Sequence, residues 1–189
     1  MQRYSVAYYS NKDIWFGQDN YVPVMKQNYE IRIYNMDGSV PTEFSTLLTL
    51  ATDTIGSIKE DQDVITVHYG NSVIKFPNKV SFSDTDWRLN CYCSPNVLEG
   101  LRAWRKKCYN SDDETMGLPS EYMKLGFIIR YDGKGNPRDG IKLPGVWIRG
   151  LDNGDYDQSG DIVKVSTTLV ISKAIYLTQD DLMNGTLRG

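Results

Sequence analysis

The three cysteines and the single histidine are the side chains with the clearest capacity for chemistry. Cys91 and Cys93 form a C-x-C pair, Cys108 follows fifteen residues later, and His68 lies upstream. Three thiolates and one imidazole could complete a tetrahedral zinc site. However, structural zinc sites usually use C-x2-4-C spacing, and this pair lies in the alternating segment W-R-L-N-C-Y-C, which is typical of a half-buried strand. We therefore interpret the cysteines as small buried apolar residues and expect no metal.

An acidic segment offers a second possible metal site. Residues 155–162, DYDQSGDI, follow the first eight positions of an EF-hand calcium loop. The twelfth position is Ser166, where calcium needs a bidentate glutamate, and the flanking segments have the pattern of strands. We predict an Asp/Gly-rich turn, and we expect no cofactor of any kind.

The sequence gives little support for catalysis. It contains no G-x-S-x-G, P-loop or G-x-G-x-x-G motif, and DGKGNPRDG reads as a hairpin turn. A lone histidine provides no triad that could be argued from sequence. We predict that the protein is not an enzyme.

Composition and charge argue against further classes of protein. The net charge of −3 argues against a protein that grips phosphate backbones, which needs a concentrated basic surface. No apolar run reaches the ~20 residues that span a bilayer, so we expect no membrane anchor. The N-terminal residues lack the apolar core of a signal peptide, and the cysteine count is odd. Both features favour a protein made in the cytoplasm.

The elements that would position these residues are mostly strands. We expect one helix, about 94–109, with Ser94 as N-cap and Pro95 in its first turn. Short turns such as Asp37-Gly38 imply antiparallel pairing. We expect a β-barrel or sandwich of two antiparallel sheets flanked by that helix. The expected strands are 28–36, 44–52, 64–70, 73–78, a strand from 86, 126–132, 139–151 and 162–177.

Three parts follow along the chain: an N-terminal arm (1–27), a β-barrel domain (28–177) and a C-terminal tail (178–189). The period-two and helical patterns also predict which residues pack the helix onto the sheet. These helix-to-sheet core residues are Trp87, Leu89, Cys91, Cys93, Leu98, Leu101, Trp104 and Cys108.

The order of short motifs over residues 28–177 resembles the tail tube proteins of contractile-tailed bacteriophages, which are related to the tube proteins of type VI secretion. No single motif is specific, and the ordered set carries the resemblance. The motifs are A-T-x-x-x-G-x-I (Ala51, Thr52, Gly56, Ile58), F-x-D-x-D-W (Phe82, Asp84, Asp86, Trp87), P-x-E-Y-x-K (Pro119, Glu121, Tyr122, Lys124) and G-V-W (Gly145, Val146, Trp147).

The resemblance implies a ring-forming fold, with six copies per ring and rings stacked into the inner tail tube of a virion. DNA would pass through the lumen during genome ejection. The implied partners are other copies of the chain, the sheath, baseplate and tail-terminator proteins, and the tape-measure protein and phage DNA in the lumen. Segments 53–63, 70–80 and 111–121 are the expected stacking contacts. The lumen-facing candidates are Lys164, Ser166, Thr168, Ser172, Arg88, Asn90 and Tyr92.

Three alternatives stay open at this point. A baseplate tube-initiator ring or a tube subunit of a type VI-like contractile secretion system would share the fold. A monomeric β-sandwich that binds calcium or carbohydrate belongs to a different class, with the acidic loop and exposed tyrosines as its site.

Overall fold

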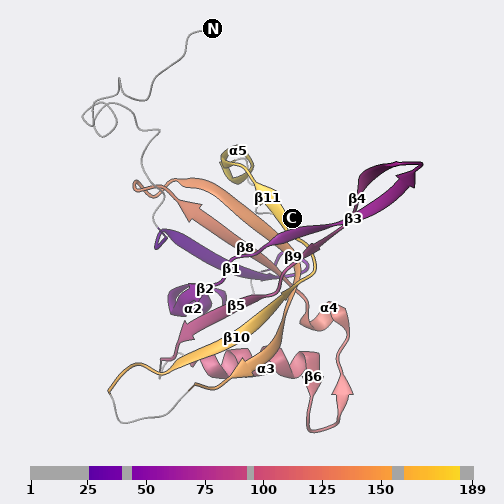
Figure 1. The fold of residues 1–189 in the computed structure, drawn as a ribbon. Helices are drawn as coiled ribbons and strands as arrows, with labels where there is room; N and C mark the ends of the chain where they lie inside the picture. The colour runs from indigo at the N-terminus through magenta and orange to yellow at the C-terminus, as the bar shows by residue number, and fades with distance from the viewer. Residues whose placement is uncertain (1–25, 40–43, 93–95, 155–159, 184–189) are drawn as a thin grey trace.

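A curved antiparallel sheet forms the body of the protein (Figure 1). The computed structural model describes residues 26–39, 44–92, 96–154 and 160–183. Within them the strands are β1 (Tyr29–Asn35), β2 (Thr52–Ile55), β3 (Glu60–Tyr69), β4 (Ser72–Phe82), β5 (Thr85–Asn90), β6 (Tyr109–Asn110), β7 (Thr115–Met116), β8 (Lys124–Tyr131), β9 (Pro137–Asp152), β10 (Lys164–Ile171) and β11 (Ile175–Leu177). The helices are α2 (Phe44–Ala51), α3 (Val97–Cys108), α4 (Pro119–Tyr122) and α5 (Gln179–Met183). The mainly β, antiparallel fold class expected from the sequence is confirmed.

The longest strand, β9, joins the two halves of the sheet. The strand order is β1-β8-β9-β10-β5-β2, and β11 pairs with β9 beside β10. The first part of β9 pairs with β8 and β11, and its last part pairs with β10. Gly145, at φ 85°, lies between the two parts, where only glycine adopts this conformation without strain. The expected pair of sheets is therefore two halves of one sheet that continues through β9.

The terminal strand expected at 162–177 is divided in two. β10 ends at Ile171, and β11 begins at Ile175 against an earlier part of β9. In the gap, the Ser172 hydroxyl donates to the Gly145 carbonyl oxygen at 2.8 Å. The alternating sequence could not reveal this break, because both pieces keep an apolar face toward the protein.

Helix α2 joins the two edge strands of the sheet, β1 and β2. Thr49 Oγ1 of α2 donates to the Ile31 carbonyl of β1, and Tyr29 Oη donates to the Asp53 carbonyl of β2 at 3.3 Å. The strand predicted for residues 44–52 is wrong. The Thr/Leu-rich run fits either period, and burial of Leu48 and Ala51 on one helical face decides for the helix.

Helix α3 packs against one face of the sheet beside β9 and covers its core (Figure 1). It begins at Val97, and the Asn96 side chain caps it by accepting from the Glu99 amide at 3.2 Å. The helix was expected from about 94 with Ser94 as its cap. Ser94 and Pro95 lie outside the described residues, and the cap is Asn96, a side chain as well suited to this role as serine.

A single tryptophan occupies the centre of this core. Trp87 of β5 is fully buried, and its Nε1 donates to Thr52 Oγ1 at 3.1 Å, where β2 begins. Trp104 of α3 is also buried, and its Nε1 donates to the Tyr122 carbonyl of α4 at 2.7 Å. Both indole N–H groups therefore have partners, which removes the cost of burying them.

A second, smaller cluster lies on the other face of β8. Phe127 packs there with Leu177 of β11 and Leu182 of α5. Residues 179–183, expected to be part of a polar tail, thus pack on the sheet of their own chain. Residues 184–189 and most of the predicted N-terminal arm, 1–25, lie outside the described residues.

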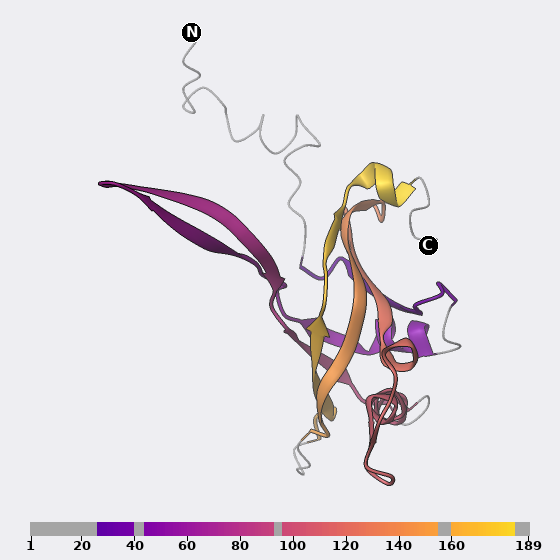
Figure 2. The ribbon, with the colours of Figure 1, turned by 90° about the vertical axis from the view of Figure 1, so that its right-hand side faces the viewer.

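Two pieces of the chain extend away from this body. The β3–β4 hairpin projects far beyond the sheet, and the β6–β7 arm extends from the end of α3 on another side (Figure 2). The sequence predicted the hairpin with its turn at Gly70-Asn71, and the structure extends its strands to Glu60 and Phe82.

A half-buried polar cluster connects β1 to β8. The Arg32 guanidinium donates two hydrogen bonds to the Glu30 carboxylate, at 2.7 and 2.9 Å, and the Tyr131 hydroxyl donates to the same carboxylate. Burial opposes ionisation of Glu30, but these donors together lower its pKa. Burial and the neighbouring carboxylate raise the pKa of Tyr131 to about 12.

We expect Trp87→Ala to lower the free energy of unfolding by about 3–5 kcal/mol, because it leaves a large cavity between β5, α2 and α3. Trp147→Ala removes the same atoms from a half-exposed position and serves as the control. Urea denaturation followed by circular dichroism measures both. Equal losses for the two variants would contradict the central role of Trp87.

Tyr131→Phe should cost about 1 kcal/mol at neutral pH, because it removes a hydrogen bond to a carboxylate. Since the folded pKa of Tyr131 is raised from 10.0 to about 12, its stabilisation is complete below pH 10 and is lost as the pH rises toward 12. The stability difference between wild type and variant should therefore shrink across that interval. Tyr69→Phe, at an exposed position, is the control, and a difference independent of pH would refute the prediction.

Candidate functional site

The most polar face of the sheet is the outer surface of β9, β10, β5 and β2. Strict alternation along β10 and β5 creates it, because most of the residues that point away from the core are polar. The strand register then aligns them in rows across the sheet. One row contains Asp152, Ser166, Arg88 and Thr54, and the next contains Gly150, Thr168 and Asp86.

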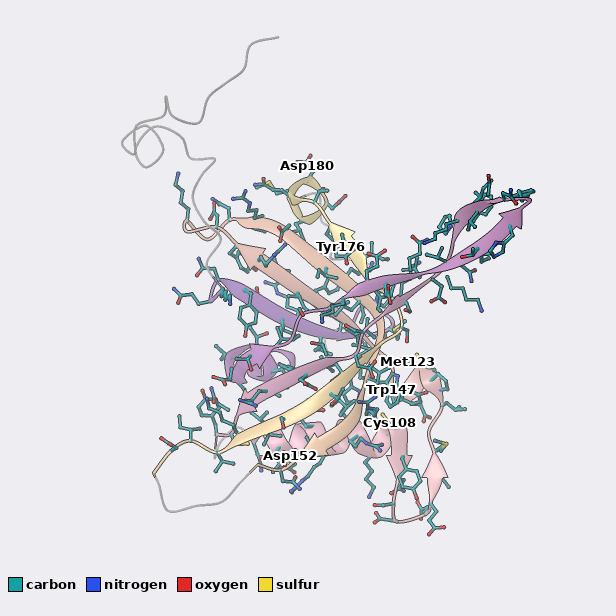
Figure 3. The ribbon with its side chains drawn as sticks, in the orientation of Figure 1. Cys108, Met123, Trp147, Asp152, Tyr176 and Asp180 are labelled. Carbon is teal, nitrogen blue, oxygen red and sulfur yellow. The ribbon has the colours of Figure 1, made fainter. Side chains whose placement is uncertain are left out.

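Short side chains leave a shallow depression of about 610 Å³ in this polar face. Ser166 Oγ donates to Asp152 and Thr168 Oγ1 donates to Asp86, each at 3.4 Å. These bonds run across the strands and hold the carboxylates against the surface. Figure 3 shows Asp152 at the end of β9 that borders this face.

The charges on the polar face are largely compensated. The Lys164 ammonium lies 3.1 Å from Asp53, and Arg149 donates to Asp84 at 2.8 Å just before the start of β5. The charged residues of the two aligned rows, counted together with the Lys164–Asp53 ion pair, include more carboxylates than cations. The carboxylates are Asp53, Asp86 and Asp152, and the cations are Arg88 and Lys164.

The structure brings five of the seven lumen-facing candidates together on the polar face. The five are Lys164, Ser166, Thr168, Arg88 and Asn90. Tyr92 follows the end of β5 and is 42% exposed. Ser172 lies beyond the end of β10, in the gap before β11, so the structure does not group it with the others. Their orientation toward a lumen stays a prediction.

The predicted helix-to-sheet core residues that the structure describes lie on the side of the sheet opposite the polar face. Buried residues among them are Trp87, Leu89, Leu101, Trp104 and Cys108, and half-buried ones are Leu98 and Cys91. Cys93 lies outside the described residues.

The residues considered for metal binding are dispersed. Burial raises the pKa of the Cys91 and Cys108 thiols, which disfavours the thiolate that a metal requires. His68 is exposed on the projecting hairpin. In the described ranges, no three His, Cys, Asp or Glu side chains are grouped to hold a metal ion. Residues 155–159 of the calcium-like segment lie outside those ranges.

Sequence reasoning missed three of the carboxylates on the polar face. Asp86 has the same strand parity as Arg88 and Asn90, so the alternation could have identified it. Asp53 and Asp152 lie on other strands, and only the cross-strand register places them beside Lys164 and Ser166.

The fold has clear relatives among solved structures, although no protein-family model and no curated protein matches the sequence. The PVC sheath/tube terminator of an extracellular contractile injection system has a TM-score of 0.63 at 13% identity, covering 82% of this chain and 97% of that one. A chain of the PVC sheath-tube complex has a TM-score of 0.60 at 13% identity, covering 93% and 99%. The SPP1 tail tube has a TM-score of 0.52 at 13% identity, covering 88% and 86%.

These similarities establish the fold: the chain has the tail-tube fold, as its order of motifs suggested. Structures that share it belong to a phage tail tube and to tube and terminator assemblies of contractile injection systems. At this level of identity they define the architecture only. Separately, none of the helices in the described part of the chain is long and apolar enough to cross a membrane.

The alternation along β10 predicts opposite results for two adjacent substitutions. Thr168→Lys should change the free energy of unfolding by no more than about 0.5 kcal/mol, because its side chain lies on the polar face near Asp86. Leu169→Lys should cost about 3 kcal/mol or more, because it places a charge in the core. Urea denaturation compares the two variants, and similar stabilities would show that the two faces are assigned incorrectly.

Proposed function

We propose that this protein is a structural subunit of the inner tube of a contractile tail or injection system. Copies close into rings, with six per ring as in the proteins it resembles, and the rings stack into a channel. The polar face of β9, β10, β5 and β2 lines the channel. In a phage the tube belongs to the virion and conducts DNA during genome ejection.

The projecting β3–β4 hairpin is the observation that carries the proposal. An isolated two-stranded hairpin is marginally stable in water, and this one leaves large apolar side chains exposed. Exposed apolar patches of this kind mark contact surfaces. The exposed residues are Val64, Ile65, Tyr69, Val73, Ile74, Phe76 and Val80. On a fold shared with tube assemblies, the simplest partner for this surface is another copy.

The electrostatics of the polar face suit a channel for nucleic acid. DNA binds strongly to surfaces with many unpaired Lys and Arg, because binding releases condensed counterions. Here Lys164 lies beside Asp53, and carboxylates exceed cations on the face. Hydroxyls of Ser166 and Thr168 occupy its centre. DNA, and a tape-measure protein before it, would slide past such a wall without being held.

A terminal ring is the second candidate, because one similar structure is a sheath/tube terminator. A terminator or baseplate ring of the same fold would close into a ring without propagating. A terminal ring and a repeating subunit would both contact sheath and baseplate proteins and have no catalytic role.

Negative-stain electron microscopy and sedimentation of the purified protein test the proposal. Long tubes with a central channel are expected for the repeating subunit, and single rings would favour the terminal ring. A protein that stays monomeric over a range of concentrations, with a melting temperature raised by calcium, would contradict both and favour a monomeric binding module.

A further inference from the structure

The β3–β4 hairpin has two unlike faces. Residues that pair directly across two antiparallel strands point to the same side. Ile65 pairs with Phe76, whereas Thr66 pairs with Lys75 on the opposite side. Ile65, Ile74 and Phe76 are each more than 40% exposed, although such side chains normally lie inside a protein. Apart from Ser72 at the turn, the apolar face consists of Ile65, Val67, Tyr69, Ile74 and Phe76.

The hairpin has no third strand among the described residues. β3 and β4 pair only with each other, and a two-stranded sheet needs further strands or packing to be stable in water. In the tube that we propose, another copy covers the apolar face. A subunit that has not assembled has no such neighbour, so only its own chain can then cover this face.

The N-terminal segment, residues 1–25, has a composition that suits such a cover. Chains that stay unfolded in water contain few aromatic residues, but six of these 25 residues are aromatic, against 12% of the whole chain. Two basic and two acidic side chains balance each other, so the segment brings no net side-chain charge to an uncharged face. The aromatic residues are Tyr4, Tyr8, Tyr9, Trp15, Phe16 and Tyr21.

The segment is also attached close to the hairpin and is long enough to follow it. It leads into β1, where Tyr29 Oη donates to the Asp53 carbonyl of β2 at 3.3 Å. Only residues 56–59 separate β2 from β3, the first strand of the hairpin. An extended chain of this length spans up to about 80 Å, and the longer hairpin strand, β4, spans about 35 Å.

We propose that residues 1–25 lie over the apolar face of the β3–β4 hairpin of the same molecule before assembly, with aromatic side chains against Ile65, Ile74 and Phe76. A face covered in this way cannot contact another copy, so the segment limits assembly to places where an existing ring displaces it. The contact forms within one molecule, and only its consequence for assembly rests on the proposed function.

Photo-crosslinking in the full chain tests the contact. A benzophenone amino acid in place of Phe76 should crosslink to peptides from residues 1–25, and in place of Lys75, on the opposite face, it should not. Each variant is mixed with an excess of isotopically heavy wild type, below the concentration at which sedimentation detects assembly. Light N-terminal peptides show a contact within one molecule. Heavy ones, crosslinks to other segments only, or no crosslink would overturn the proposal.

Hydrogen exchange gives a second measurement on the full chain. Amides of residues 1–25 should exchange about tenfold or more slowly than in a free peptide of the same sequence, because packing shields them from water. Ile74→Ser with Phe76→Ser should restore the free-peptide rate. Thr66→Ser with Lys75→Ser, on the opposite face, is the matched control and should leave the protection unchanged. Free-peptide rates in the wild type would contradict the contact.

Substitutions in the segment test its effect on assembly. A chain with Tyr4→Ser, Val6→Ser and Tyr8→Ser should assemble after a severalfold shorter lag, because a larger fraction of subunits then has an open apolar face. Gln2→Ser with Gln18→Ser removes polar side chains from the same segment and should leave the lag unchanged. Light scattering measures the lag, and equal lags for all three proteins would show that the segment does not limit assembly.

The two proposals fail in different ways. A wild type that assembles but shows neither the crosslink nor the protection refutes the N-terminal cover and leaves the proposed function standing. A wild type that never assembles overturns the proposed function, while the crosslink and the exchange rates still decide whether the segment covers the hairpin.

Discussion

The burial of Trp87 is the interaction on which the rest of the structure depends. Its indole ring fills the core between β5, α2 and α3, and its N–H bonds to Thr52 at the junction of α2 and β2. Because α2 also bonds to β1, this packing holds the two edges of the curved sheet near each other. A sheet of this size has an apolar face too large to leave in water, and the helices complete its cover.

Packing of the core on one side of β5 and β10 leaves their other side polar. This separation follows from strand geometry, because alternate side chains point to opposite faces of the sheet. The resulting surface is rich in hydroxyls and nearly neutral. Its chemistry suits passage of a charged cargo better than binding of one, which agrees with the function we propose.

The β3–β4 hairpin and the β6–β7 arm extend away from the core. The hairpin and the arm hold apolar side chains that no part of the described chain covers. Left uncovered, these surfaces cost stability and solubility, because apolar groups remain in contact with water. In the assembly that we propose, they would be contact surfaces. The fold thus separates a self-sufficient body from extensions that suit contact with further copies.

The sequence by itself determined the strand alternation, the amphipathic helix α3 and the hairpin. These features depend on local periodicity and turn chemistry, which are properties of neighbouring residues. Only the tertiary structure decided that 44–51 is a helix, that the last strand divides at Ser172, and that Asp53 and Asp152 join the polar face. Each of these depends on contacts between residues far apart in the chain, and no local pattern specifies such contacts.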